Sequence, residues 1–255
     1  MIRRSGGRAV AGVLAVGALI AGVSGCGASA GDDKHPDHRS VAVHGRTLTV
    51  DSDDASLEIV GARGDGRTVR VTRWFEASVI VGGRPRVSWS FQDDRLTLRM
   101  HCSGVVADCA VRYRIEVPRG LGVAVVDGNG GVRARGFAEP LAVRTGNGAV
   151  RVTDSTGALD LHSDNGAVRA DVASRRVRAD VSNGAVDLTL GAVPDLVHAH
   201  SDNGRVTVAL PRAAYHVDAE SDNGRVSVSV PKDDRSRHAV TAGSSNGEVT
   251  VRTAN

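Results

Sequence analysis

Between residues 129 and 255, apolar and polar positions alternate in short blocks that are separated by Asn-Gly pairs. The third residue after each Asn is always Val, the fifth is always apolar, and the residue between them never is. Because successive side chains of a β-strand point to opposite faces, this period of two predicts a strand with one buried face. The block before each following Asn-Gly alternates in the same way, so each unit is predicted to contain two short strands and two turns. The valines are Val132, Val150, Val168, Val186, Val206, Val226 and Val249.

The spacing of the Asn-Gly pairs indicates how these units are arranged. The pairs begin at residues 129, 147, 165, 183, 203, 223 and 246, which gives intervals of 18, 18, 18, 20, 20 and 23 residues. A single unit cannot bury its apolar face, so equivalent strands are expected to stack in parallel, about 4.8 Å apart. The sequence therefore predicts an all-β fold, a parallel β-solenoid (β-helix) with coils of about 18–20 residues.

Two features of the repeat qualify this prediction. In an antiparallel sandwich or hairpin meander, Asn-Gly would instead mark a two-residue turn, but such folds do not require identical columns across all units. Asn tolerates the left-handed backbone region and Gly prefers it, which suits a tight corner. The hexapeptide SDNGRV occurs at residues 201–206 and 221–226, and its two copies are expected to form corners of successive coils.

Outside the repeat, residues 41–128 alternate less regularly and contain five of the seven aromatic residues, Trp74, Phe75, Trp89, Phe91 and Tyr113. We expect a β-rich N-terminal cap region over 41–128, continuous with the Asn-Gly repeat β-solenoid over 129–255, because a solenoid needs an atypical unit to cover its first coil. At the other end, the last coil is expected to leave an open strand edge. That edge would either pair with another subunit or be blunted by Glu248 and Arg252.

The first 25 residues have the pattern of a signal peptide. Arg3, Arg4 and Arg8 precede an apolar run from Ala9 to Val23 that is short for a membrane-spanning helix. Val23-Ser24-Gly25-Cys26 resembles the lipobox of bacterial lipoproteins. In that family the chain is cut before the cysteine, which receives fatty acyl groups such as palmitate. The alternative is an ordinary secretory signal with an incidental cysteine.

This resemblance implies that 1–25 is a lipoprotein signal peptide, that Cys26 is lipidated, and that the protein sits at the extracytoplasmic face of the cell membrane. Residues 26–40 are small, polar and Pro-containing, so a flexible tether is expected there. The leader also changes the charge balance. The chain has 32 basic and 29 acidic residues, and the leader holds three Arg and no acid, so the remainder is balanced at 29 each. This balance gives no reason to expect a nucleic-acid partner.

Two cysteines remain, Cys102 and Cys109. In an oxidising compartment, two cysteines this close across a Gly-containing turn predict a disulfide. A metal site would need further ligands, and only His101 and Asp108 are adjacent.

Outward positions of the second strand in each unit suggest candidate chemistry. His198 and His200 point to the same side, and Asp180, Asp218 and Glu220 are expected on neighbouring coils, which makes a Zn²⁺ or Cu²⁺ site sterically possible. The simpler interpretation is a ladder of alternating charges, worth about 0–1 kcal/mol per exposed pair. The Asp before several Asn-Gly pairs is similar to calcium-binding nonapeptide repeats, but the dense glycine pattern of those repeats is lacking.

A third outward column is basic. Arg133, Arg151 and Arg169 are predicted to stack into a short stripe that would contact an anionic wall polymer or phospholipid. The alternative is a solvated face that is partly offset by Asp171 and Asp187.

Longer segments resemble a known family. The run YRIEVPRGLGVAVVDGNGGVRARGF, with its VP-x-G step at Val117–Gly120, and the reiterated TGNGAVRV and SDNGAVRADV are similar to the bacterial "putative adhesin" family over roughly residues 45–252. That resemblance implies a β-solenoid of unknown function at the cell surface, sometimes linked to envelope-stress sensing, and it transfers no catalytic residues.

Together these observations predict a lipid-anchored, extracytoplasmic, adhesin-like binding or structural module, not an enzyme, with no cofactor. Its expected partners are the membrane through the lipid anchor, an envelope protein or wall polymer, and a second copy through the C-terminal coil. The second interpretation is a metal- or wall-polymer-binding envelope-stress sensor. The third is a polysaccharide-active β-helix enzyme, which is disfavoured because the repeats offer only Phe137 and Tyr215 as aromatic platforms and contain no catalytic motif.

Overall fold

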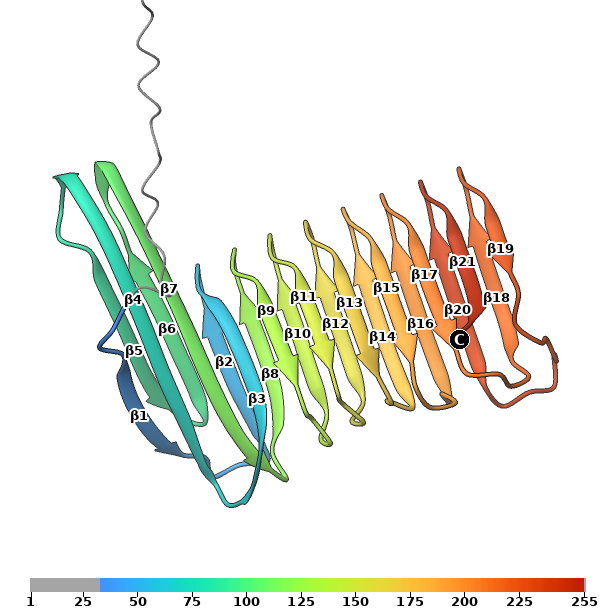
Figure 1. The fold of residues 1–255 in the computed structure, drawn as a ribbon, viewed down its shortest axis with the longest axis horizontal. Helices are drawn as coiled ribbons and strands as arrows, with labels where there is room; N and C mark the ends of the chain where they lie inside the picture. The colour runs from blue at the N-terminus through green and yellow to red at the C-terminus, as the bar shows by residue number, and fades with distance from the viewer. Residues whose placement is uncertain (1–32, 255) are drawn as a thin grey trace, which may run out of the picture.

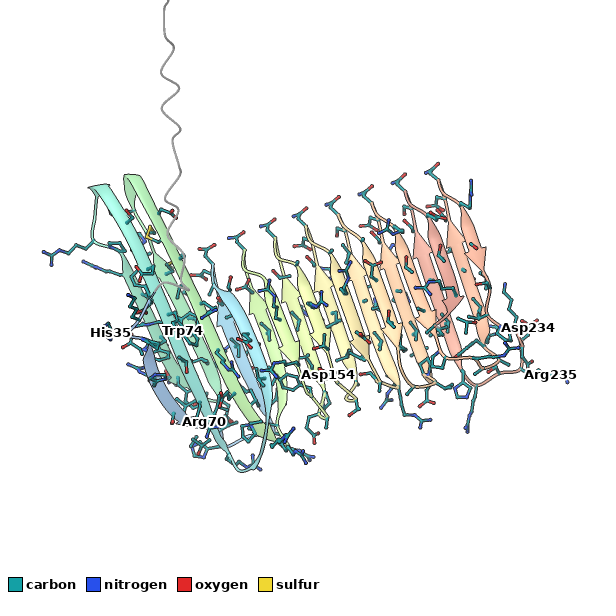
Figure 2. All side chains as sticks on the ribbon, in the orientation of Figure 1. His35, Arg70, Trp74, Asp154, Asp234 and Arg235 are labelled. Carbon is teal, nitrogen blue, oxygen red and sulfur yellow. A yellow bond between two sulfur atoms is a disulfide. The ribbon has the colours of Figure 1, made fainter. Side chains whose placement is uncertain are left out.

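The computed structural model describes residues 33–254, in which two long β-sheets face each other and side chains fill the space between them (Figures 1 and 2). The predicted signal peptide, Cys26 and the first part of the predicted tether lie outside the described residues. Every regular element from 33 to 254 is a strand. The predicted all-β fold class is therefore confirmed.

The first sheet has eleven strands and contains the strand that follows each Asn-Gly pair. In spatial order its strands are β1 (Asp37–Ala42), β4 (Thr68–Gly82), β7 (Gly104–Arg119), β3 (Ser56–Asp65), β9 (Val132–Arg135), β11 (Val150–Thr153), β13 (Val168–Val172), β15 (Val186–Leu190), β17 (Val206–Leu210), β21 (Val249–Thr253) and β19 (Val226–Val228).

The second sheet has ten strands and contains the other strand of each coil. In spatial order its strands are β18 (His216–Ser221), β20 (Ala239–Ser244), β16 (Leu196–Ser201), β14 (Arg176–Val181), β12 (Leu159–Ser163), β10 (Leu141–Thr145), β8 (Gly122–Asp127), β2 (Thr47–Ser52), β6 (Arg95–His101) and β5 (Arg86–Gln92).

Parallel pairing of equivalent positions builds the core. Val150 lies opposite Val132 on one side and Val168 on the other, and the column continues through Val186 and Val206. Each of these valines is at most 1% exposed. Burying such a side chain contributes about 1.5–3 kcal/mol, so the recurring valine records the stacking requirement of the repeat. The solenoid prediction holds, and the antiparallel meander is excluded for this region.

The stack begins earlier than the first Asn-Gly pair. β2 pairs in parallel with β8, and β3 pairs in parallel with β9, so β2 and β3 form a regular coil within the region predicted to be a cap. β6 and β7 continue the stack, and β1, β4 and β5 close it with antiparallel pairing. β1 starts at Asp37, inside the segment 26–40 for which a tether was expected.

The far end of the stack differs from the predicted order. The coil of β20 and β21 lies between the coil of β16 and β17 and the coil of β18 and β19, with parallel pairing on both sides. The prediction that the two SDNGRV copies form successive corners is therefore wrong, because the corner at Asn246 separates them. The predicted open edge at Glu248 and Arg252 is wrong for the same reason, and β18 and β19 are the end strands.

The Asn-Gly corners stack directly on one another. The side-chain amide of Asn165 donates to Oδ1 of Asn147 at 2.9 Å and accepts a hydrogen bond from Asn183 at 3.0 Å. This ladder runs from Asp54 through Asn129, Asn147, Asn165, Asn183, Asn203, Asn246 and Asn223. Because each amide from Asn129 to Asn246 both donates and accepts, the ladder satisfies these corner side chains, and Asn223 ends it as a donor.

The glycine that follows each Asn is needed for a reason other than the one predicted. A Cβ on Gly166 would lie 2.2 Å from the carbonyl oxygen of Gly148 in the next coil, and a Cβ on Gly204 would lie 2.0 Å from that of Gly184. Gly148, Gly166 and Gly204 do not adopt the left-handed region. The expectation of a left-handed corner is therefore wrong at these positions, where the close approach of neighbouring coils excludes a side chain.

Candidate functional site

The outer face of the eleven-stranded sheet brings the three predicted arginines side by side. Arg151 lies opposite Arg133 on β9 and opposite Arg169 on β13, and all three side chains are exposed. Arg169 forms an ion pair with Asp187 of the next strand at 3.1 Å. Arg133 and Arg151 form no ion pair with any residue in the described range 33–254. Neither guanidinium is therefore ion-paired, although Glu58 on β3 lies opposite Arg133 in the sheet register.

These arginines surround a shallow hollow of about 150 Å³. It is lined by Glu58, Arg133, Ala134, Arg135, Arg151 and Thr153. Glu58 closes one end and is shared between Arg114 at 3.6 Å and Arg135 at 3.7 Å. Guanidinium groups on adjacent strands repel each other unless an anion bridges them, and they bind carboxylate or phosphate oxygens through paired N–H groups. The hollow therefore has the charge and shape to hold an anionic group; we call its six lining residues the arginine hollow.

Sequence reasoning found part of this site and missed the rest. The stripe of Arg133, Arg151 and Arg169 follows from repeat spacing, and the register places it as predicted. Glu58 and Arg135 were missed, because β3 belongs to the less regular region before the repeats. A signal existed, since Arg135 is the next outward residue after Arg133 on the same strand.

The outer face of the ten-stranded sheet carries the predicted charge ladder. Arg144 pairs with Asp160 at 3.3 Å, and Asp180 forms an ion pair with Arg178 at 2.8 Å and accepts a hydrogen bond from His198 at 3.2 Å. His162 and His200 each contact the aspartate two residues later, Asp164 at 3.0 Å and Asp202 at 3.1 Å. Most charges on this face are thus partnered, in contrast to Arg133 and Arg151.

The structure separates the residues that were proposed as metal ligands. His198 lies beside Asp180, but β20 intervenes between β16 and the strand that carries Asp218 and Glu220. Thr241 and Gly243 of β20 occupy the adjacent positions. Among residues 33–254, no group of three or more His, Cys, Asp or Glu side chains is placed to hold a metal ion. The arrangement therefore gives the metal hypothesis no support.

The N-terminal end contains contacts that the sequence did not predict. The guanidinium groups of Arg39 and Arg73 lie 4.7 and 4.9 Å from the ring centre of Trp89, and Arg112 lies 4.3 Å from that of Trp74. Cation–π contacts of this kind contribute about 0.5–1 kcal/mol at exposed sites. The sequence showed that most aromatic residues lie in this region, but it did not indicate their arginine partners.

The predicted disulfide is present. It joins Cys102, just after β6, to Cys109 on β7, with the two Cα atoms 6.2 Å apart. The bond therefore ties the two sheets together where they project beyond the first coil.

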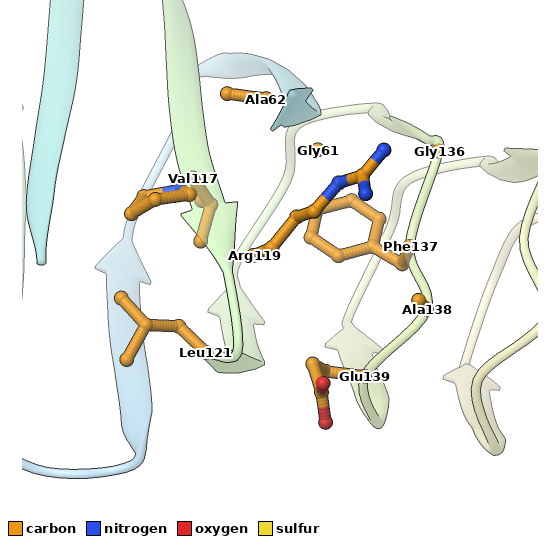
Figure 3. Close-up of a pocket in the computed structure, with 10 residues that line it drawn as sticks. Gly61, Ala62, Val117, Arg119, Leu121, Gly136, Phe137, Ala138 and Glu139 are labelled. Carbon is orange, nitrogen blue, oxygen red and sulfur yellow. The ribbon is translucent and has the colours of Figure 1, made fainter. Parts of the chain in front are cut away.

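A separate cavity of about 290 Å³ lies where β7 and β9 end. Figure 3 shows Arg119 reaching across Phe137 toward Gly136, with Glu139 on the lower side. Phe137 is buried, whereas Arg119 is exposed and Glu139 is half-buried. The mixed lining of one aromatic ring and two opposite charges does not point to one ligand class.

Within residues 33–254 there is no helix long and apolar enough to cross a membrane. A family model described as Toastrack DUF4097 matches residues 28–255 of the chain. No curated protein matches this chain.

Three solved structures are similar to this chain. A "putative adhesin" from Bacteroides fragilis has 12% identity and a TM-score of 0.51, over 87% of this chain and 98% of its own. A "putative cell adhesion protein" from Clostridium sporogenes has 12% identity and a TM-score of 0.37, over 86% and 100%. A "putative adhesin" from Parabacteroides merdae has 8% identity and a TM-score of 0.35, over 87% and 97%. The similarity to the Bacteroides protein concerns the fold alone.

Proposed function

We propose that this chain, which belongs to the Toastrack DUF4097 family, is a lipid-anchored extracytoplasmic module that binds an anionic polymer of the cell envelope. Family membership confirms the resemblance that was drawn from the repeated segments. The activity of the family is not established, so the proposed function depends on the surface of this molecule.

One observation carries the binding proposal. Arg133 and Arg151 stand in register on neighbouring strands of the solenoid, exposed and in no ion pair, at the rim of the arginine hollow. An exposed like-charge column is destabilising in a sheet, and repeated phosphate or carboxylate groups would relieve that repulsion. A polymer with such groups at regular intervals can extend along the stack toward Arg169.

The envelope location is proposed from the sequence of the leader. The order of a basic start, an apolar run and Val23-Ser24-Gly25-Cys26 supports cleavage before Cys26 and acylation of its thiol. A short chain connects Cys26 to β1, which would hold the solenoid close to the membrane surface. The disulfide between Cys102 and Cys109 supports an oxidising compartment.

Binding without catalysis is the simplest role for such a surface. The name of the similar protein from Bacteroides fragilis refers to adhesion, which supports a binding role here. The charged side chains of the two outer faces are held mostly in ion-pair ladders rather than around an enclosed cavity.

The experiment is a binding measurement of the purified mature chain on immobilised polyphosphate at low and moderate salt. The variant Arg133→Gln/Arg151→Gln is expected to bind at least about tenfold more weakly, because it removes two guanidinium contacts of about 1–3 kcal/mol each. Arg205→Gln/Arg225→Gln is the matched control, since it removes the same charge from two exposed corner positions. Equal losses in both double variants would show that net charge alone determines binding, and would contradict the proposed site.

A further inference from the structure

The described chain begins against the strand that leads away from the solenoid. Asp33 accepts a hydrogen bond through Oδ2 from the backbone N–H of Phe75 on β4, at 3.0 Å. Figure 2 labels His35 near Trp74, in agreement with this contact and with the hydrogen bond from His35 to Asp33. The segment that arrives from Cys26 is therefore joined to the solenoid at Phe75.

From Phe75 onward, β4 and the first half of β7 project beyond their neighbours. β1 pairs with β4 only as far as Arg73, and β3 pairs with β7 only from Arg112 onward. Residues 75–82 and 104–111 pair with each other in antiparallel fashion, from Phe75 opposite Val111 to Gly82 opposite Gly104. We call these two segments the β4–β7 ribbon; Figure 1 shows its ends standing well past the adjacent strands.

The ribbon is unusually apolar for a projecting element. Its sequences are FEASVIVG and GVVADCAV, in which Glu76 and Asp108 are the only charged residues. Phe75, Ala77 and Val79 share one face, with Ala77 exposed and the other two half-buried. They line a hollow of about 380 Å³ together with Gly82, Gly83, Arg84 and Pro85. An apolar two-stranded projection in water is a liability unless something covers it.

The length of the chain allows the predicted anchor to reach the height of the ribbon tip. The seven steps from Cys26 to Asp33 span at most about 25 Å when extended. The seven steps from Phe75 to Gly82 span about 23 Å along a strand. Because Asp33 is bonded at Phe75, the acylated residue can reach the level of the tip, and it cannot lie much beyond it. The exposed Arg84 and Arg86 follow directly after the tip.

We propose that the tip of the β4–β7 ribbon inserts into the headgroup region of the membrane beside the acyl anchor, so that the protein is held at two points. This inference rests on the proposed acylation of Cys26. Val79, near the tip, contacts the upper part of the acyl chains, and Arg84 and Arg86 pair with lipid phosphates.

The insertion would fix the orientation of the whole molecule. β7 runs away from the tip, and β3 and the strands stacked on it run parallel to β7, so their Asn-Gly corners face the membrane. The corner at Asp54 lies near the level of Ala110, about 20 Å from the tip. The long axis of the stack then lies parallel to the membrane, and the arginine hollow faces sideways.

The test uses the acylated chain, purified from cells that produce it and reconstituted in vesicles of phosphatidylethanolamine and phosphatidylglycerol with brominated acyl chains. Bromine quenches tryptophan only within a short distance. Val79→Trp and Arg84→Trp are expected to gain emission that bromine quenches at least about twofold more than the emission gained by Thr207→Trp, on an outer face of the solenoid. The unaltered chain gives the background of Trp74 and Trp89.

Each outcome of this test is decisive. Equal quenching at positions 79, 84 and 207 overturns the proposal. If the indole introduced by Val79→Trp is shielded from bromine and from aqueous iodide alike, the ribbon is covered by the chain itself or by a second copy of it, and the proposal is again overturned. Two tip variants guard against misfolding of one. A mass spectrum that shows no acyl group on Cys26 would refute the anchor separately, and quenching of the unacylated chain added to the same vesicles would still report on the ribbon.

Discussion

At the scale of single residues, the Asn-Gly pattern located the corner glycines correctly, but the expected reason for glycine at these positions was wrong. The Asn-Gly cadence marks the corners, but a left-handed backbone would also explain glycine, and sequence alone does not separate the two causes. The register separates them, because the carbonyl of Gly148 occupies the space that a Cβ on Gly166 would need.

Gly166→Ala is expected to lower the free energy of unfolding by roughly 2–4 kcal/mol, because its methyl group meets backbone atoms that cannot move without breaking the stack. Gly64→Ala is the matched control. A Cβ at Gly64 has nothing within 4 Å, so its effect should stay within about 0.5 kcal/mol. Urea unfolding of both variants at one protein concentration checks this, and equal effects would contradict it.

Asp127 predicts a pH dependence of stability. Burial raises the pKa of Asp127 from its ordinary value of 3.8 to about 6, and the nearby Asp54 and Asp53 add to the effect. Between pH 4 and 6 the folded protein therefore binds more protons at this site than the unfolded chain does. The contribution of Asp127 to the free energy of unfolding falls as the pH rises through this window and stays low above it.

Asp127→Asn should remove this contribution and stabilise the protein at pH 8 by about 1–2 kcal/mol relative to its effect at pH 4.5. The amide oxygen still accepts from the N–H of Gly130, which Asp127 contacts at 2.5 Å. Urea unfolding of the unaltered protein and the variant at the two pH values isolates the contribution of Asp127, because all other titratable groups are present in both proteins. An identical difference at pH 4.5 and pH 8 would refute it.

At the scale of elements, strands and registers were predictable where the repeat is regular. Alternation identifies each strand, and Val150 opposite Val132 and Val168 follows from the 18-residue spacing. Spatial order was not predictable at the end of the chain. The units of the repeat have the same apolar columns, so the sequence does not indicate which units are neighbours. It therefore gives no sign that β20 and β21 lie between the coil of β16 and β17 and the coil of β18 and β19.

Cysteine pairs test the observed order. Thr207 and Ser227 both lie opposite Thr250, on either side of it. Oxidation should link Thr207→Cys to Thr250→Cys, and Ser227→Cys to Thr250→Cys, because neighbouring strands are about 4.8 Å apart. The pair Thr207→Cys and Ser227→Cys should stay reduced, because β21 lies between the two strands and the two positions are about twice that distance apart. A link in this last pair, seen as a shifted band on a non-reducing gel, would mean that the coils stack in sequence order.

At the scale of the whole molecule, the two candidate surfaces depended differently on this order. The arginine stripe falls in coils that stack in sequence order, so its prediction survives. The proposed metal ligands span the region of rearranged order, and the inserted β20 separates Asp218 and Glu220 from His198 and His200. The contacts of Trp89 with Arg39 and Arg73 join strands far apart in the sequence, and no local pattern indicates them.

The end coil predicts self-association. β18 and β19 end the two sheets, and Val226 on β19 is 40% exposed. We expect the apparent mass of the purified chain to rise toward that of a dimer with concentration, because an uncovered strand edge pairs readily. Val226→Arg should suppress this rise. Val126→Arg is the control, since Val126 is 48% exposed on a strand inside the stack. Light scattering that shows a strict monomer at high concentration would rule the pairing out.

The inserted coil also constrains how the molecule is completed during synthesis. A chain that is made from its N-terminus releases residues 216–228 before residues 239–253. The earlier segment carries a second copy of SDNGRV, so it can dock directly on β16 and β17 and form a temporary end to the stack. To reach the arrangement in Figure 1, that provisional coil must detach and let the later segment enter beneath it. Synthesis from the N-terminus would thus favour one stacking order first, and the other order would be the more stable one. The rate of exchange between the two would set the time at which the newly made protein reaches its final fold.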